Sequence, residues 1–388
     1  MRPTPRRLLV VGSIAACASA AVAVPVLAAG QDDLVAVTAA QGTPVPGRYI
    51  VTLRDGASSS TTAGRVNAAG TKRLSVINGF VAKLTPSQLD KLRHDKSVAA
   101  IEQDQIVKAD TTQKAPLPWG LDRIDQRSRT LSKTYTYKST GSGVNAYIID
   151  TGIDAQHPQF GGRASVAWWA PDSFTNGNDC NGHGTHVAGI IGSKTYGAAK
   201  GVKLRALRVL DCDGSGYMSD VLDAANWLKG HAVKPAVANL SLGGPKSTAV
   251  NTALTNLSKS GVFVTVAAGN DNKNACNYSP ASAGWVEAVG ATTIYDNKAS
   301  FSNYGSCVDI QAPGYGITST WPGGGSQVES GTSMATPYVA GVAALYLATH
   351  KTATFPTVQK WLADNSTKNV VKKLPSGTPN RLLYKAGL

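Results

Sequence analysis

Residues 181–189 read Asn-Gly-His-Gly-Thr-His-Val-Ala-Gly, and this stretch carries the clearest chemical signal in the chain. It opens a helix predicted over residues 183–195, with His183 at the first position and a glycine on each side. Glycine has no side chain, so other groups can approach the ring of His183 closely. His183 and His186 also have a spacing that can bind a metal, but no His-Glu-x-x-His pattern and no nearby third ligand accompany them. We expect His183 to take part in chemistry and His186 to be packed or hydrogen bonded behind it.

Two further polar motifs stand at the ends of predicted elements. Asp150 directly follows an apolar segment at 144–149, and Gly152 permits a sharp exit of the chain. Residues 330–341, Ser-Gly-Thr-Ser-Met-Ala-Thr-Pro-Tyr-Val-Ala-Gly, place Ser333 at a helix N-terminus, where backbone N–H groups and the helix dipole stabilise developing negative charge. Taken singly, an Asp before a turn and a Ser at an N-cap are ordinary structural features. Together with His183, in the order Asp, His, Ser, they indicate a catalytic triad.

Apolar segments alternate with helical patterns from Trp119 onward. This alternation is typical of a parallel sheet covered by helices on both faces. In such sheets the chemistry lies at the carboxyl ends of the strands, and the polar motifs fall there. The predicted strands cover residues 144–149, 204–210, 236–240, 262–267 and 286–289, and the predicted helices cover 183–195, 219–231, 247–260 and 333–349.

The three motifs resemble those of the subtilisin family, and within it the proteinase K-like or aqualysin-like branch, over residues 119–388. The resemblance implies an α/β catalytic domain of three layers with a mostly parallel sheet. It also implies a serine endopeptidase in which Asp150 orients His183 and His183 accepts the proton of the nucleophile Ser333. Asn270, which ends the stretch Ala-Ala-Gly-Asn at 267–270, is implied as the side-chain donor of the oxyanion hole.

The same resemblance implies where a protein or peptide substrate binds. Two short segments would flank an extended substrate and pair with its backbone, which favours broad specificity. Small or apolar groups would wall the pocket for the residue before the scissile bond, so aromatic and aliphatic side chains are expected there. The flanking segments are Gly214, Ser215, Gly216 and Ser241, Leu242, Gly243, and the pocket walls are Ala267, Ala268, Gly269 and Leu242.

The N-terminal part of the chain predicts a secreted, extracellular enzyme made as a zymogen. Residues 1–29 have the basic head, apolar stretch and small-residue end of a signal peptide. Strand patterns at 47–53, 78–84 and 98–107 and a helix opening at Thr85-Pro86 predict a small α+β domain. This domain resembles the propeptide inhibitor domain of subtilisin-like proteases. We expect a propeptide over 30–111, with its inhibitor domain at about 47–108, and a peptidase domain over 112–388.

The cysteines and the residues near 284–309 add two expectations. Cys17 lies in the signal, and the other four cysteines suggest two disulfides, for which spacing alone allows three pairings. Resemblance to thermostable relatives implies the pairs Cys180–Cys212 and Cys276–Cys307. It also implies a structural calcium ion bound by the carbonyls of Gly284 and Val286 and the carboxylate of Asp309. No catalytic cofactor is expected.

Charge and motif content weigh against other classes of function. The net charge of +14 comes from Lys and Arg scattered along the whole chain, so no nucleic acid partner is expected. No stable membrane association is expected either, and the enzyme is expected to be a monomer with its own propeptide as intramolecular inhibitor. A catalytically silent peptide-binding relative would lack a triad or oxyanion residue, and an esterase usually has Gly-x-Ser-x-Gly, which is absent around Ser333.

Overall fold

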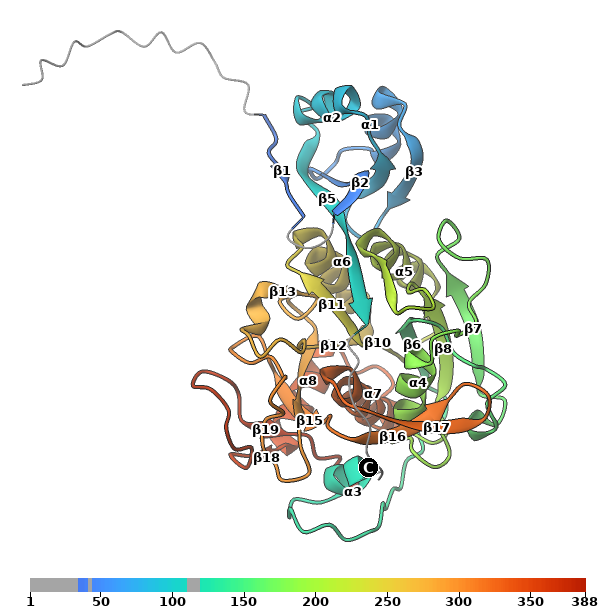
Figure 1. Cartoon of the computed structure of the whole chain (residues 1–388), viewed down its shortest axis with the longest axis vertical. Coiled ribbons are helices and arrows are strands. Elements are labelled where there is room, and N and C mark those ends of the chain that lie inside the picture. The colour runs from blue at the N-terminus through green and yellow to red at the C-terminus, as the bar shows by residue number, and fades with distance from the viewer. Residues whose placement is uncertain (1–33, 41–43, 110–118) are drawn as a thin grey trace, which may run out of the picture. The chain divides into compact units, whose positions relative to one another are not determined.

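The computed structural model describes residues 34–40, 44–109 and 119–388, and within them nine strands form one mostly parallel sheet (Figure 1). All neighbouring strands in it are parallel except the last pair, β19 and β18. The predicted parallel α/β sheet is thus confirmed. In spatial order the strands are β7 (Ala164–Trp169), β8 (Lys203–Arg208), β6 (Asn145–Asp150), β10 (Ala236–Leu240), β12 (Val262–Ala267), β14 (Glu287–Thr292), β15 (Ile310–Pro313), β19 (Arg381–Leu382) and β18 (Thr367–Lys368).

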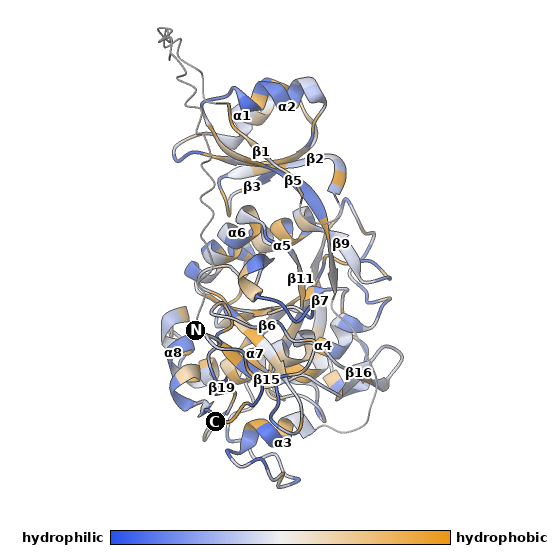
Figure 2. Cartoon of the chain, turned by 60° about the vertical axis from the view of Figure 1, so that its left-hand side comes forward, coloured by the Kyte–Doolittle hydropathy of each residue, from blue (hydrophilic) through white to orange (hydrophobic). Residues whose placement is uncertain are grey.

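Helices cover both faces of this sheet. Successive side chains of a strand point to opposite faces, so each strand contributes to the core on either side. In β6, Ala146 and Ile148 pack into one core with α4 and α7, whereas Tyr147 and Ile149 pack into the other core with α5 and α6. Figure 2 shows α7 in hydrophobic colours, as expected for a helix buried on all sides. The helices are α3 (Trp119–Asp125), α4 (His183–Gly192), α5 (Met218–His231), α6 (Thr248–Lys259), α7 (Thr332–Thr349) and α8 (Phe355–Asn365).

The N-terminal domain is the small α+β unit that the sequence predicted. Its sheet has the order β5-β2-β4-β3, with β1 (Val37–Thr38) beside β5, and it covers a core of its own. The predicted helix begins at Pro86, where Thr85 and Gln88 form a capping box. Helix α1 and strand β3 were not predicted. The elements are β2 (Pro44–Leu53), α1 (Ser59–Val66), β3 (Ala69–Leu74), β4 (Gly79–Lys83), α2 (Pro86–Arg93) and β5 (Val98–Ala109).

Short elements complete the structure. They are η1 (Pro158–Phe160), β9 (Ser215–Tyr217), β11 (Leu242–Pro245), η2 (Ala275–Asn277), β13 (Tyr278–Ser279) and the hairpin of β16 (Ile317–Trp321) and β17 (Gly325–Glu329). Among the described residues, no helix combines the length and the apolar character that crossing a membrane requires. The predicted signal peptide lies outside the described residues.

Candidate active site

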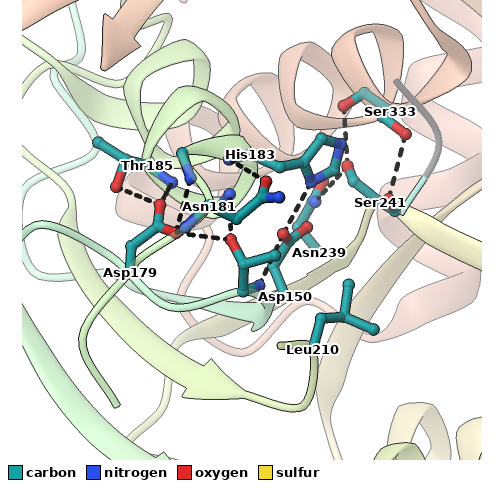
Figure 3. Close-up of polar contacts among 12 residues, drawn as sticks. Asp150, Asp179, Asn181, His183, Thr185, Leu210, Asn239, Ser241 and Ser333 are labelled. Atoms are coloured by element: carbon teal, nitrogen blue, oxygen red, sulfur yellow. Dashed lines mark hydrogen bonds and ion pairs between the residues drawn. The ribbon is translucent and has the colours of Figure 1, made fainter. Parts of the chain in front are cut away.

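Asp150, His183 and Ser333 come from three elements whose ends meet at one edge of the large sheet. Asp150 is the last residue of β6, His183 is the first residue of α4, and Ser333 is the second residue of α7. All three are fully buried in the presence of the N-terminal domain. Figure 3 shows the imidazole of His183 between the carboxylate of Asp150 and the side chain of Ser333. The structure therefore brings together the three residues that the motifs singled out.

A short hydrogen bond joins Asp150 to His183. The Nδ1 atom of His183 lies 2.7 Å from Oδ1 of Asp150, and the same oxygen accepts the backbone N–H of Thr151 at 2.8 Å. An ionised carboxylate at Nδ1 selects the imidazole tautomer that carries its proton on that nitrogen. The basic nitrogen of this tautomer is Nε2. The pair can thus present a general base at the end of β6.

Ser333 and Ser241 fix the N-terminus of α7 against the end of β10. The Ser333 hydroxyl donates to the backbone oxygen of Ser241 at 3.1 Å, and the Ser241 hydroxyl donates to the backbone oxygen of Ser333 at 2.8 Å (Figure 3). Asn239 supports the second bond by donating from Nδ2 to the Ser241 hydroxyl at 2.9 Å. These reciprocal bonds hold the Ser333 hydroxyl at the N-terminus of α7, which is the positive end of the helix dipole.

The side-chain amide of Asn270 is anchored by the first residue of α7. Its Oδ1 accepts the backbone N–H of Thr332 at 2.9 Å and the Thr332 hydroxyl at 3.0 Å. Gly269 precedes it with φ of 99°, and a Cβ atom there would lie 2.4 Å from Nδ2 of Asn303. Only glycine suits this backbone conformation and this space. Because these bonds hold Oδ1, the orientation of the Asn270 amide is fixed, and Nδ2 is its hydrogen-bond donor.

His186 packs one helical turn behind His183. It is fully buried, and its Nε2 lies 3.1 Å from the backbone oxygens of both Ile317 and Gln327, in the hairpin of β16 and β17. Burial, with His183 nearby, lowers the pKa of His186 to about 3. His186 is therefore neutral and donates its Nε2 proton to these carbonyls, which is the hydrogen-bonded role expected from the sequence.

Comparison with known proteins decides the family. Residues 141–382 match the family model described as the subtilase family, peptidase S8. The chain belongs to this family. It is 51% identical over 310 residues to the extracellular serine proteinase of Thermus sp. (strain Rt41A), which covers 79% of this chain and 75% of that protein. Proteinase R of Parengyodontium album is 42% identical over 355 residues, covering 89% and 90% of the two chains.

A solved structure supports the same assignment. The crystal structure of a cold-adapted subtilisin-like serine proteinase matches this subtilase with a TM-score of 0.68 and 48% identity, over 70% of this chain and 98% of that one. Residues 58–110 match a second family model, peptidase inhibitor I9. The protein is thus a subtilisin-type serine endopeptidase, and its N-terminal α+β unit is a propeptide domain.

The last strand of the propeptide domain lies between two strands of the catalytic domain. Strand β5 pairs antiparallel with β9, where Val107 is opposite Gly216 and Lys108 is opposite Ser215. On its other side β5 pairs with β11, where Lys108 is opposite Gly243 and Ala109 is opposite Leu242. The structure thus brings together the two segments expected to flank a substrate, and an extended chain occupies the space between them. Gly214 precedes β9 with φ of 75°, and Ala267, Ala268 and Gly269 lie at the end of β12.

Two acidic residues of β5 cap helices of the catalytic domain. Glu102 accepts the Ser247 hydroxyl at 2.6 Å and the Ala249 backbone N–H at 2.7 Å, at the start of α6. Asp104 accepts the Ser219 backbone N–H at 3.0 Å, at the start of α5. N–H groups in the first turn of a helix lack partners within the helix, and negative charge is favourable there. The propeptide domain thus stabilises both helix ends while it is bound.

More carboxylates than cations gather beside the start of α5. Arg48 lies 3.1 Å from Asp104 and 3.6 Å from Asp220. Lys72 lies 2.5 Å from Asp223 and 3.6 Å from Asp172. Burial raises the pKa of Asp223 to about 7 and that of Asp220 to about 6, even though the nearby cations oppose this shift. Four carboxylates thus face two cations of the propeptide domain. We call the carboxylates the acidic cluster: Asp104, Asp172, Asp220 and Asp223.

Both disulfides implied by the resemblance are formed in the structure. Cys180 and Cys212 have Cα atoms 5.0 Å apart, and Cys276 and Cys307 have Cα atoms 5.3 Å apart. The first bond joins the segment before His183 to the segment before β9. It therefore connects the segment that precedes His183 to the segment that leads into β9, a strand that pairs with β5.

The residues implied as calcium ligands lie where β14 and β15 begin. Val286 directly precedes β14, and Asp309 directly precedes β15. Oδ2 of Asp309 accepts the backbone N–H of Ala288 at 2.8 Å, and the backbone oxygen of Gly284 accepts the Thr255 hydroxyl at 2.6 Å. These carbonyl and carboxylate oxygens are hard ligands of the kind that calcium prefers.

A second buried carboxylate adjoins this group. Glu287 is 1% exposed, and its Oε2 atom has no hydrogen-bond partner among the described residues. Burial, with Asp309 nearby, raises the pKa of Glu287 well above its usual value, and burial raises that of Asp309 to about 6. Two neighbouring buried carboxylates favour positive charge beside them, although among the described residues no three or more His, Cys, Asp or Glu side chains form a group that could hold a metal ion.

Proposed function

We propose that this subtilase cleaves peptide bonds through an acyl-enzyme formed on Ser333. Asp150 holds His183 with a proton on Nδ1, and Nε2 accepts the Ser333 proton as the hydroxyl oxygen attacks the substrate carbonyl carbon. His183 then gives this proton to the leaving amine, and a water molecule deprotonated by the same histidine releases the acyl group. The observation that carries the proposal is the bond of 2.7 Å between His183 and Asp150, beside Ser333.

The attack creates an oxyanion, for which we assign two donors. They are Nδ2 of Asn270 and the backbone N–H of Ser333 at the start of α7. Donors that are fixed before the reaction stabilise developing charge without reorganising. The anchoring of Oδ1 of Asn270 by Thr332, at 2.9 Å and 3.0 Å, supports this assignment.

Substrates would bind as β5 does, between β9 and β11. Affinity then comes largely from backbone pairing, which supports broad specificity. The pocket before the scissile bond would be walled by Leu242 and by the segment Ala267, Ala268 and Gly269, and none of these side chains carries charge. We therefore propose a preference for aromatic and aliphatic residues at that position.

The enzyme would process its own precursor. Ala109, the last described residue of β5, pairs with Leu242, and the preceding residue Ser241 contacts Ser333. A bond just beyond Ala109 would therefore meet the nucleophile at high effective concentration. We place the signal peptide at 1–29, the propeptide at 30–111 and the peptidase domain at 112–388, with the mature N-terminus within a few residues of Thr112, which lies outside the described residues.

The enzyme would act outside the cell as a monomer on protein substrates. Two relatives bear the names extracellular serine proteinase and alkaline serine exoprotease A, and the signal-like residues 1–29 agree with export. The scattered positive charge supports neither a nucleic acid partner nor stable membrane association. The freed propeptide domain would remain as an inhibitor until it is lost.

A structural calcium ion would be held by the backbone oxygens of Gly284 and Val286 and by the carboxylate of Asp309. Its contribution would be to stabilise the loop before β14 and the start of β15. The ion takes no part in the peptide cleavage proposed above.

Labelling of the nucleophile tests the proposed function. Mature protein is incubated with a serine-reactive fluorophosphonate, hydrolysis of a peptide substrate is followed, and the modified residue is located by mass spectrometry. We expect complete loss of hydrolysis with a single adduct on Ser333. As a control, Ser326→Ala at an exposed position of β17 should leave labelling and hydrolysis unchanged. Hydrolysis that persists in fully labelled protein, or an inactive unlabelled protein, contradicts the proposal.

A further inference from the structure

The helix that carries His183 starts without a side chain of its own at the N-cap, because that residue is Gly182. Four N–H groups at a helix start have no partner within the helix, and they are usually satisfied by a capping side chain. Here side chains from outside the helix supply every partner. Gly182 N–H donates to Asp179 at 2.8 Å, His183 N–H to Asn181 at 3.1 Å, Gly184 N–H to Thr151 at 2.9 Å, and Thr185 N–H to Asp179 at 2.9 Å.

Asp179 accepts two of these four bonds and three further hydrogen bonds (Figure 3). Its Oδ1 accepts the Thr151 hydroxyl at 2.9 Å, the Asn181 N–H at 3.0 Å and the Gly182 N–H at 2.8 Å. Its Oδ2 accepts the Thr185 N–H at 2.9 Å and the Thr185 hydroxyl at 2.6 Å. Five donors converge on one carboxylate, and an amide cannot replace it, because an amide has one acceptor oxygen and its nitrogen is a donor.

These bonds connect the two partners of the catalytic pair. Thr151 directly follows Asp150, and its hydroxyl donates to Asp179 while it accepts the N–H of Gly184, the residue after His183. Arg208, at the end of β8, holds the neighbours of Asp179 on both sides, because it donates to the backbone oxygen of Asn178 at 3.0 Å and to Cys180 Sγ at 3.1 Å. One carboxylate therefore links the start of α4 to the residue that follows Asp150.

We propose that Asp179 is the positioning residue that sets the hydrogen bond between Asp150 and His183. It acts through Thr151 and the first turn of α4 and touches neither the nucleophile nor the Asp150–His183 pair. The inference rests on the proposed roles of Asp150 and His183. A carboxylate that fixes the loop before the histidine keeps Nε2 in line with Ser333, and a displacement of about 1 Å there costs about 10²-fold in rate.

The test compares Asp179→Asn with wild type in mature protein. Variant precursors are processed by a trace of tagged wild-type enzyme, which is then removed. We expect kcat to fall about 10- to 100-fold with KM changed less than about threefold, and the rate of fluorophosphonate labelling of Ser333 to fall in parallel. Thr151→Val should lose turnover in the same way, and Thr151→Ser, which restores the hydroxyl, should regain most of it.

A control separates positioning from loss of stability. Asp296→Asn breaks the buried ion pair with Arg123, whose Nε lies 2.8 Å from Oδ1, at a site that does not contact the triad. It should lower the thermal midpoint and leave kcat within about twofold. Turnover of Asp179→Asn within twofold of wild type, or an equal loss in Asp296→Asn, overturns the inference. If Asp179→Asn does not fold, the Thr151 pair decides it, and an inactive wild type would instead refute the proposed function.

Discussion

The triad and the acidic cluster both contain buried carboxylates, and they differ in how this negative charge is balanced. At the triad, one carboxylate, Asp150, faces one imidazole and one backbone N–H, with all contacts of 2.8 Å or less. In the acidic cluster, four carboxylates face Arg48 and Lys72, and burial raises the pKa of Asp220 to about 6 and of Asp223 to about 7.

The difference follows from what each region has to do. The contacts of Asp150 lie within the catalytic domain, so they persist when the propeptide domain leaves. Among the described residues, the cations paired with the acidic cluster are Arg48 and Lys72 of the propeptide domain. The excess negative charge of the cluster weakens this contact when all its carboxylates are ionised. One region is built to keep its geometry, and the other is a contact that can be released.

The largest expected effect comes from a substitution that abolishes catalysis at the triad and leaves the acidic cluster unchanged. Ser333→Ala removes the nucleophile but leaves the core and the acidic cluster intact, so a folded, uncleaved precursor should form, with turnover lowered about 10⁶-fold. N-terminal sequencing should find the wild type beginning within a few residues of Thr112 and the variant beginning near Gly30. Expression must be free of other proteases. A variant that still has a new N-terminus between Lys108 and Ala115 would show that another enzyme activates this one.

A smaller effect is expected inside the catalytic region. Asn270→Ala should keep the fold and substrate affinity but lose about 10²–10³ in kcat, because one donor to the oxyanion is removed. Steady-state kinetics on mature protein measures the split between kcat and KM. Near-normal kcat would mean that another group stabilises the oxyanion.

The acidic cluster predicts that acid conditions retain the propeptide domain. Release of the propeptide domain exposes Asp220 and Asp223 to water, so their pKa values fall toward the ordinary value of about 4. The complex binds protons more tightly than the free enzyme, so protonation stabilises the complex. This stabilisation is complete below about pH 4 and is lost as the pH rises through about 7. From Asp223 alone, we expect release to be favoured on the order of 10²-fold more at pH 8 than at pH 5.

This release is measured on processed protein that still holds its propeptide domain. Samples are incubated at each pH and then assayed briefly at one common pH, so that the titration of the triad does not enter. Asp223→Asn should flatten the dependence, whereas the same change at Asp364, an exposed residue of α8, should leave it unchanged. Equal release at both pH values would contradict the charge argument.

The smallest effect should fall on neither region. Removal of calcium by a chelator should lower the thermal midpoint by several degrees and speed autolysis, with kcat unchanged at low temperature, because an ion that binds only the folded state stabilises it. Asp309→Asn should abolish the difference between chelated and calcium-loaded protein. A midpoint and an autolysis rate that do not respond to the chelator would rule out the calcium site.

Local sequence determined much of the fold because its signals are short in range. Strand 236–240 and strand 262–267 were predicted with their observed bounds, since continuous apolar segments have few alternatives to a buried parallel strand. The helix predicted over 183–195 ends earlier, at Gly192, because Ser193 adopts an extended conformation. Helix α1 was missed because its composition is polar, and contacts with the rest of the propeptide domain, such as the burial of Ala63 and Val66, help to hold it in place.

The sequence by itself determined the identity of Asp150, His183 and Ser333, because each motif combines an element end with a reactive side chain. What only the tertiary structure decided is how these residues are held. Asp179 stands four residues before His183 with no spacing that marks it, and its role appears only when Thr151, from another strand end, reaches the same carboxylate. Likewise, the acidic cluster brings Asp104 of β5 near Asp220 of α5, more than a hundred positions further along the chain, and Arg48 contacts both carboxylates only because the two domains pack together.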